Sequence, residues 1–248
     1  MNFRKLFFAI LILSLVLINQ SFSQVIISQY TETETGSFPK GIELWNPTST
    51  TVNFASTPLV VRQGTNGSTT LTTLVTISTG TLAPGEVYVV GTNEIKTYMD
   101  LNGINAKFTF HNSQFNGDDA LQITVGGVVT DIFGNIGNDP GTEWVGSGVS
   151  TANQNIELKS GISSGSLVNW TDPSQRFQYV GPGTDLTGFG VAPGQLKPEP
   201  SFEILNSENF TNMTLGTWTP YSVTSNRDWF ASSFSNKTFA SMNGFGAD

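Results

Sequence analysis

The chain has 248 residues, one histidine and no cysteine, and its 19 acidic residues outnumber its 11 basic ones to give a formal charge of −8. An acidic chain without a Lys/Arg cluster repels phosphate backbones, so we expect no binding to nucleic acids. The lack of cysteine and of a second histidine excludes the usual zinc sites and any disulfide framework.

The first 23 residues are typical of a secretory signal peptide. Arg4 and Lys5 form a positive start, residues 6–18 are mostly apolar, and Ser21-Phe22-Ser23 has the small-x-small pattern of a cleavage site. The apolar run is shorter than the roughly 20 residues that a membrane-spanning helix needs. We therefore expect cleavage before Gln24, no transmembrane segment in the mature chain, and a secreted, periplasmic or cell-surface location.

From Gln24 to about Tyr179 the pattern has a period of two, which is typical of strands. Turn signals such as Asn66-Gly67 separate the segments. The predicted strands lie in QVIISQY, GIELWN, PLVVRQ, TLVTIS, EVYVVG, ALQITV, VVTDIF, NIELKS and RFQYV. Short strands at this spacing predict an all-β fold, an antiparallel sandwich or barrel. One short helix is predicted in TNEIKTYMDLNG, residues 92–103.

Gly126-Gly127 predicts the two-residue turn of a β-hairpin. In the simplest register Val125 pairs with Val128 and Ile123 with Thr130, which places Asp131 on the polar face. The expected apolar face consists of Leu121, Ile123, Val125, Val128 and Ile132.

Residues 181–201 are rich in Gly and Pro, which is typical of a linker. We place the sandwich at 24–190, the linker at 191–201 and a second region at 202–248. That last region is dense in Phe and Trp, and so short a segment cannot bury them alone. We therefore expect an incomplete second β-domain.

Asp118 and Asp119 stand directly before an apolar strand and have three interpretations. The favoured one is an Asx-type turn, in which their oxygens accept bonds from following backbone N–H groups. The functional rival is a calcium site with Asn116, Asp139 or Glu143 as further ligands, because hard cations bind clustered oxygens. A catalytic acid–base pair would need a pocket and shifted pKa values. Calcium is the one cofactor that the sequence suggests.

Two other features of the sequence have expected structural roles. Trp144 ends a glycine-rich loop and should plug one end of the fold, after a tight turn at Asp139-Pro140-Gly141. Glu43 precedes Asn46-Pro47 on a predicted strand, and its carboxylate should accept bonds from nearby backbone N–H groups.

Three motifs in this order resemble bacterial lamin-tail domains: GIELWNP at 41–47, NGDDAL at 116–121 and DPGTEW at 139–144. TLAPGEVYVVG at 81–91 resembles a further segment of that family. The resemblance covers about residues 25–190, implies an immunoglobulin-like antiparallel β-sandwich, and supplies no catalytic residues. The matching motif positions are Glu43, Asn46, Pro47, Asn116, Gly117, Asp118, Asp119, Asp139, Pro140, Gly141 and Trp144.

Residues 214–234, TLGTWTPYSVTSNRDWFASSF, resemble the start of choice-of-anchor jelly-roll modules in surface proteins of Bacteroidetes. That family continues past the point where this chain ends, so we expect a truncated jelly-roll-like segment at 202–248.

These features together predict a secreted, non-catalytic module for adhesion or for positioning a neighbouring domain. Its expected partner is a surface polymer, a protein or an adjacent domain. One alternative is the N-terminal accessory part of a larger secreted hydrolase, such as a nuclease or phosphatase, with its catalytic domain beyond Asp248. Another is a carbohydrate-binding module, with Trp218, Tyr221, Trp229 and Phe230 as candidates for stacking on sugars.

Overall fold

The structure is a computed structural model that describes residues 25–34, 36–112, 115–197, 229–234 and 237–242. The chain divides into two units after Glu199. The expected signal peptide and most of the expected second domain lie outside the described residues. What is described of the second unit is an antiparallel hairpin of β15 (Trp229–Phe234) and β16 (Lys237–Met242).

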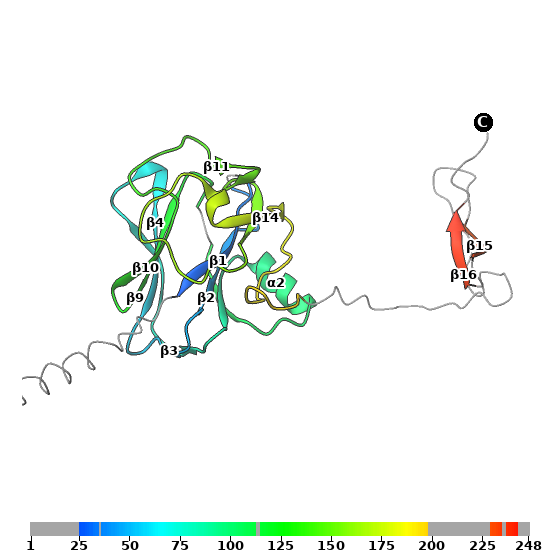
Figure 1. The fold of residues 1–248 in the computed structure, drawn as a ribbon, viewed down its shortest axis with the longest axis horizontal. Helices are drawn as coiled ribbons and strands as arrows, with labels where there is room; N and C mark the ends of the chain where they lie inside the picture. Colours follow the sequence, from blue (N-terminus) through cyan, green and yellow to red (C-terminus); the bar gives the residue numbers. More distant parts are fainter. Residues whose placement is uncertain (1–24, 35, 113–114, 198–228, 235–236, 243–248) are drawn as a thin grey trace, which may run out of the picture. The chain divides into compact units, whose positions relative to one another are not determined.

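Two main sheets build the first unit, and the all-β prediction is confirmed (Figure 1). The six-stranded sheet has the spatial order β14 (Phe177–Pro182), β13 (Gln154–Leu158), β1 (Ile26–Thr31), β2 (Gly41–Trp45), β7 (Val87–Gly91) and β8 (Lys107–Phe110). The four-stranded sheet has the order β10 (Val128–Phe133), β9 (Ala120–Val125), β4 (Leu59–Gly64) and β5 (Thr72–Ile77). Every predicted strand segment overlaps one of these strands, and β8 is the one strand of the two sheets that no predicted segment covers.

Smaller elements complete this unit. Short strand pairs are β3 (Val52–Asn53) with β6 (Thr81–Leu82) and β11 (Val145–Gly146) with β12 (Val149–Ser150). The helical elements are the 3₁₀ helices η1 (Thr65–Gly67) and η2 (Pro173–Gln175) and the helix α2 (Asn93–Leu101), which confirms the predicted helix. None of the helices among the described residues has the length and apolar character to cross a membrane.

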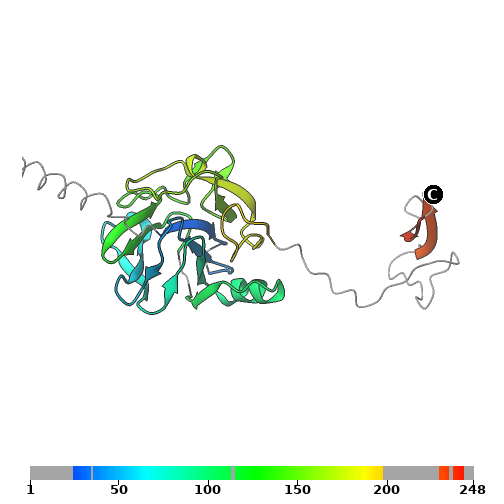
Figure 2. The same cartoon turned by 60° about the horizontal axis from the view of Figure 1, so that its bottom comes forward.

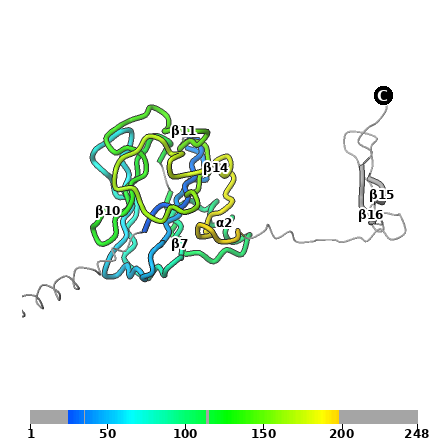
Figure 3. Tube along the Cα trace, in the orientation of Figure 1, coloured from blue at the N-terminus to red at the C-terminus, as the bar shows by residue number. Residues whose placement is uncertain are grey.

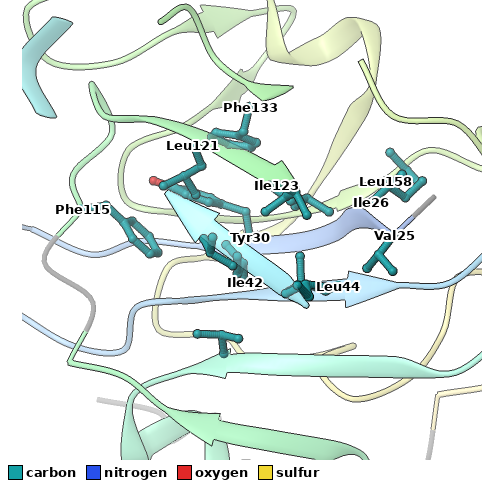
Figure 4. Close-up of a cluster of buried hydrophobic side chains, with 14 of the residues drawn as sticks. Val25, Ile26, Tyr30, Ile42, Leu44, Phe115, Leu121, Ile123, Phe133 and Leu158 are labelled. Atoms are coloured by element: carbon teal, nitrogen blue, oxygen red, sulfur yellow. The ribbon is translucent and has the colours of Figure 1, made fainter. Parts of the chain in front are cut away.

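The main hydrophobic core lies between the two sheets (Figure 4). Tyr30 of β1, the dark blue strand through the middle of Figure 2, is fully buried there. Its ring stacks on Phe133 at a centroid distance of 4.4 Å and on Phe115 at 5.3 Å. Such aromatic pairs bury large areas and tie the two sheets to the loop before β9.

The outer face of the six-stranded sheet is also covered. After β14 the chain turns back over this face beside α2, as the yellow segment in Figure 3 shows. We call residues 183–197 the strap. Leu186 and Phe189 of the strap are buried in a second apolar cluster with Val89 of β7 and Ile95 and Met99 of α2. Residues 183–192 are therefore part of the folded unit, as predicted for 183–190, and the predicted linker at 191–201 is wrong for Ala192, which is buried.

Two glycines let α2 approach the sheet. Gly41 of β2 and Gly91 of β7 are directly paired, and a Cβ atom on either would overlap the Ile95 side chain. The helix connects β7 to β8, which run parallel because a helical crossover brings the chain back in the same direction. The expectation of a purely antiparallel sheet therefore fails at this one edge.

The predicted Gly126-Gly127 turn is present, and Val125 pairs with Val128. A β-bulge at Thr130 then shifts the register, so that Asp131 pairs with Ile123. This contradicts the predicted pairing of Ile123 with Thr130, and it moves Asp131 from the expected polar face into the interior, where it is 1% exposed. Val128, expected on the apolar face, is 49% exposed.

Candidate functional site

The loops at one end of the sandwich enclose a cleft of about 450 Å³, which we call the acidic cleft. The end of β1 and the starts of β9 and β13 meet at this end because neighbouring antiparallel strands alternate in direction. The side chains and backbone that line the cleft belong to Glu32, Glu34, Asn116, Gly117, Asp118, Gly141, Thr142, Glu143, Ala152 and Asn153.

A buried ion pair lies beneath the acidic cleft. The register that pairs Thr31 with Gly41 places the next residues, Glu32 and Lys40, opposite each other. Lys40 Nζ lies 2.7 Å from Glu32 Oε1, and both side chains are at most 3% exposed. Burial raises the pKa of the Glu32 carboxyl, and the bonds from Lys40 and from the Asn153 N–H lower it.

Lys40 supplies the positive charge beneath the acidic cleft. Its Nζ donates to the Phe115 carbonyl at 3.0 Å and to Asn116 Oδ1 at 3.2 Å, as well as to Glu32. All three donor positions of the ammonium therefore have oxygen partners, which offsets the cost of burying the charge. Neither Glu32 nor Lys40 is predicted as a site residue from the sequence, because only the strand register brings them together.

Asp119 has the structural role that the sequence predicts, with donors from different segments than expected. Its two oxygens accept the backbone N–H groups of Asn116 and Asn66, both at 2.9 Å, and Gln63 Nε2 at 2.7 Å. The donors therefore lie in the turn before Asp119, in β4 and in η1, rather than in the residues that follow the carboxylate. Asp119 joins β4 and η1 to the turn before β9 and is 1% exposed.

Asp118 differs from its neighbour because it lines the acidic cleft. Burial, and then the negative charge of Asp119, raise the pKa of Asp118, while its Oδ1 is buried without a hydrogen-bond partner. Asp139 is exposed, and its Oδ1 accepts the Gly141 N–H at 2.7 Å in the predicted tight turn. Within the described ranges, no group of three or more acidic, His or Cys side chains is placed to hold a metal ion.

The calcium hypothesis therefore rests on Asp118, whose buried Oδ1 has no hydrogen-bond partner. It predicts a higher melting temperature in millimolar calcium chloride than in EDTA, because a ligand that binds only the folded state stabilises it. Differential scanning calorimetry of the mature chain in both buffers, with Asp118→Asn as the control, measures this difference. Identical melting temperatures for the wild-type chain in the two buffers would reject the hypothesis.

Glu43 has the predicted role of accepting bonds from the backbone, but on the covered outer face rather than near the acidic cleft. Its Oε2 accepts the Gly190 N–H of the strap at 2.6 Å, and its Oε1 lies 2.7 Å from Ser28 Oγ. Burial raises the pKa of Glu43 to about 8, since no cation faces it closely enough to compensate.

Asn46 of the same motif holds the next turn together. Its Nδ2 donates to the Thr50 and Leu82 carbonyls, both at 2.9 Å, and its Oδ1 accepts the Thr48 N–H at 3.1 Å. The Asn46-Pro47 pair therefore fixes the chain between β2 and β3 and contributes no free polar group to a binding surface.

Trp144 fills the interior next to the glycine-rich loop, as predicted. It is 3% exposed and packs against Trp170 at a centroid distance of 6.3 Å. Gly134 has a φ of +79°, and a Cβ atom there would overlap the Trp144 ring, so the ring occupies space that only glycine leaves open. The Trp144 N–H donates to Thr151 Oγ1, and the Thr151 N–H donates to the Trp144 carbonyl.

Asp131 is a second buried acid, and its predicted position on the polar face of the hairpin is wrong. The bulge at Thr130 lets its oxygens accept the N–H groups of Ile27 at 2.9 Å and Ser166 at 2.7 Å. Burial raises the pKa of Asp131 to about 6, and Arg176, 3.5 Å away, lowers it. Asp131 therefore ties β1, β10 and the loop before η2 together, which is a structural role.

Comparison with protein-family models, with curated proteins and with solved structures gives no match to this chain. The fold and the cleft by themselves define an all-β sandwich with a covered outer face and an acidic cleft among the loops at one end.

Proposed function

We propose that this chain is a non-catalytic accessory module of an exported protein, with a lamin-tail-type, immunoglobulin-like sandwich, and that it acts in adhesion or in positioning a neighbouring domain. The observation that carries the proposal is the use of charge at the loop end. Three charged side chains at this end are buried: Lys40, Glu32 and Asp119. Lys40 donates to Glu32, and Asp119 accepts the Asn66 N–H, so these charges bind within the fold rather than to a substrate. They hold the rim of the acidic cleft in one arrangement.

A rigid rim of loops on a β-sandwich is a frequent location for binding surfaces. Around the acidic cleft, Glu34, Gly141 and Thr142 are exposed, and Glu143 is half-buried. These groups are available to a partner without disturbing the buried network below them. We take the partner to be a polymer or protein of the cell surface, or an adjacent domain, that enters the cleft.

A bulky side chain placed in the acidic cleft should weaken this binding whether the partner is charged or neutral. We expect Thr142→Trp to lower the binding constant for isolated bacterial cell envelopes about tenfold or more, equal to about 1.4 kcal/mol. Cosedimentation of the mature chain with envelopes, quantified against protein concentration, measures the effect. Thr97→Trp is the matched control, because Thr97 is equally exposed on α2, away from the cleft.

The same preparations separate the proposal from its rivals. Equal binding by the two Trp variants, or no binding by the wild-type chain, contradicts a role for the acidic cleft. Competition by soluble glycans that Thr142→Trp leaves unchanged favours the carbohydrate-binding alternative. Hydrolysis of nucleic acids or phosphate esters by the purified chain would contradict the non-catalytic assignment.

A further inference from the structure

The two halves of the strap are held on the six-stranded sheet in different ways. The first half is held by uncharged side chains: Thr31 Oγ1 donates to the Gly183 carbonyl at 2.8 Å, and Gln29 Nε2 donates to the Thr187 carbonyl at 2.8 Å. The buried rings and methyl groups of Leu186 and Phe189 anchor the same half. None of these interactions depends on pH.

The second half of the strap, residues 190–197, is held by carboxylates. Glu43 accepts the N–H group of Gly190 at 2.6 Å. At the far end, Lys197 Nζ lies 2.6 Å from Glu157 Oε2 of β13. Between these two points a pocket of about 260 Å³ separates the strap from the sheet, so this half has fewer apolar contacts than the first.

The protonation state of Glu43 sets the free-energy cost of burying its side chain between the sheet and the strap. Glu43 is 1% exposed. When neutral, its Oε1–H can donate to Ser28 Oγ, which in turn lies 3.3 Å from the Glu43 carbonyl, while Oε2 accepts the Gly190 N–H. When ionised, the carboxylate is enclosed between sheet and strap without a cation of its own, which is costly in a buried position.

The charges around this position do not compensate an ionised Glu43. Glu157 is negative and opposes ionisation, and Lys197 is already paired with Glu157. On the other side of Gly190, Lys107 is paired with Glu86 at 2.5 Å. The ionisable groups at the first half of the strap are Asp185 and Tyr98.

We propose that residues 190–197 are a proton-controlled latch, docked on the sheet while Glu43 is neutral and released when Glu43 ionises. Release lets water reach the carboxylate, while Leu186 and Phe189 keep the first half of the strap in place. The latch is a property of the outer face and is independent of the acidic cleft at the loop end.

The direction of the pH effect follows from the raised pKa of Glu43. In the docked state burial raises the pKa of Glu43 to about 8, whereas access to water in the released state brings this pKa back towards the ordinary value of 4.5. Between these values the docked state binds more protons, so docking is strongest at low pH and weakens as the pH rises. The docking equilibrium should fall about tenfold for each pH unit in this window and level off above it.

Hydrogen exchange of the full chain, followed by mass spectrometry from pH 5 to 9, tests the latch. After correction for intrinsic exchange, the Gly190 amide, which donates to Glu43, should lose protection about tenfold per pH unit in peptides from 190–197, while the amides of β2 and of 183–187 stay constant. In Glu43→Gln the acceptor for Gly190 is kept but cannot ionise, so this loss should disappear. Glu94→Gln, which removes an exposed carboxyl on α2 away from the strap's carboxylate contacts, is the control that should keep it.

Three results would overturn the latch. They are a wild-type chain whose 190–197 amides show no pH dependence, a Glu43→Gln variant that keeps it, or a loss of protection that extends equally through β2. A carbon-detected NMR titration of the Glu43 carboxyl in the wild-type chain gives a test that needs no variant. Its midpoint should lie near pH 8, and a midpoint near 4.5 contradicts the proposal.

Discussion

Replacing Lys40 by Met should lower the free energy of unfolding by about 3–5 kcal/mol, the usual cost of removing one partner of a buried ion pair. The change leaves Glu32 buried without its cation and removes the donor from the Phe115 carbonyl and from Asn116 Oδ1. Because a typical domain has only about 5–15 kcal/mol of stability, much of the variant should be unfolded at moderate urea concentrations. Urea denaturation followed by Trp fluorescence measures the difference.

The pH dependence of this loss identifies Glu32 as its cause. Without Lys40 the pKa of the buried Glu32 rises further, so the folded variant gains a proton that the unfolded chain lacks. The loss of stability should therefore be largest near pH 8 and smaller near pH 5. Glu32→Gln together with Lys40→Met should recover part of the loss. Lys96→Met is the matched control, since its pair with Asp100 on α2 is exposed and contributes under about 1 kcal/mol.

Replacing Trp144 by Ala should cost about 3–5 kcal/mol, the range for truncating a buried aromatic side chain. The ring fills the space above Gly134 and packs on Trp170, which in turn packs edge-on against Phe133 in the main core. The cavity would lie where the glycine-rich loop joins the interior, and that loop cannot collapse into it without moving Thr151. For a unit of this size the melting temperature should fall by about 2–4 °C per kcal/mol.

Tyr179→Ala is the control for the tryptophan variant. Tyr179 is an aromatic of the edge strand β14 and is 51% exposed, so its truncation should cost within about 0.5 kcal/mol. A Trp144→Ala loss as small as this one would contradict the role of the ring as the plug of this end. Calorimetric melts of the two variants under the same conditions decide the matter.

The strands of the two main sheets other than β8, and the helix, could be predicted because each depends on a local pattern. The period of two marks the strands, and Ile95 and Met99, four residues apart, mark the buried side of α2. Gly126-Gly127 marks its turn through the positive φ of both glycines. Each of these signals is complete within about a dozen residues of the chain.

The remaining features depend on contacts between distant segments. The Glu32–Lys40 pair depends on the register of β1 and β2, and the burial of Asp131 depends on a bulge that no sequence signal marks. The strap has the Gly and Pro content of a linker, and the apolar partners of Leu186 and Phe189 lie on β7 and α2, far away in sequence. The same limit applies to the acidic cleft, whose lining comes from four separate loops.

The position of β1 also affects the order in which the protein folds. Gln29 pairs with Glu43 on one side and with Glu157 on the other, so this first strand is internal to its sheet. Until the chain has been made as far as β13, β1 has an open edge and Asn155 cannot reach Gln29. Contacts of such long sequence separation slow folding, typically into the range of milliseconds to seconds. The sandwich should therefore complete its folding only after nearly the whole unit has been synthesised, and fragments that end before β13 should expose a strand edge prone to aggregation.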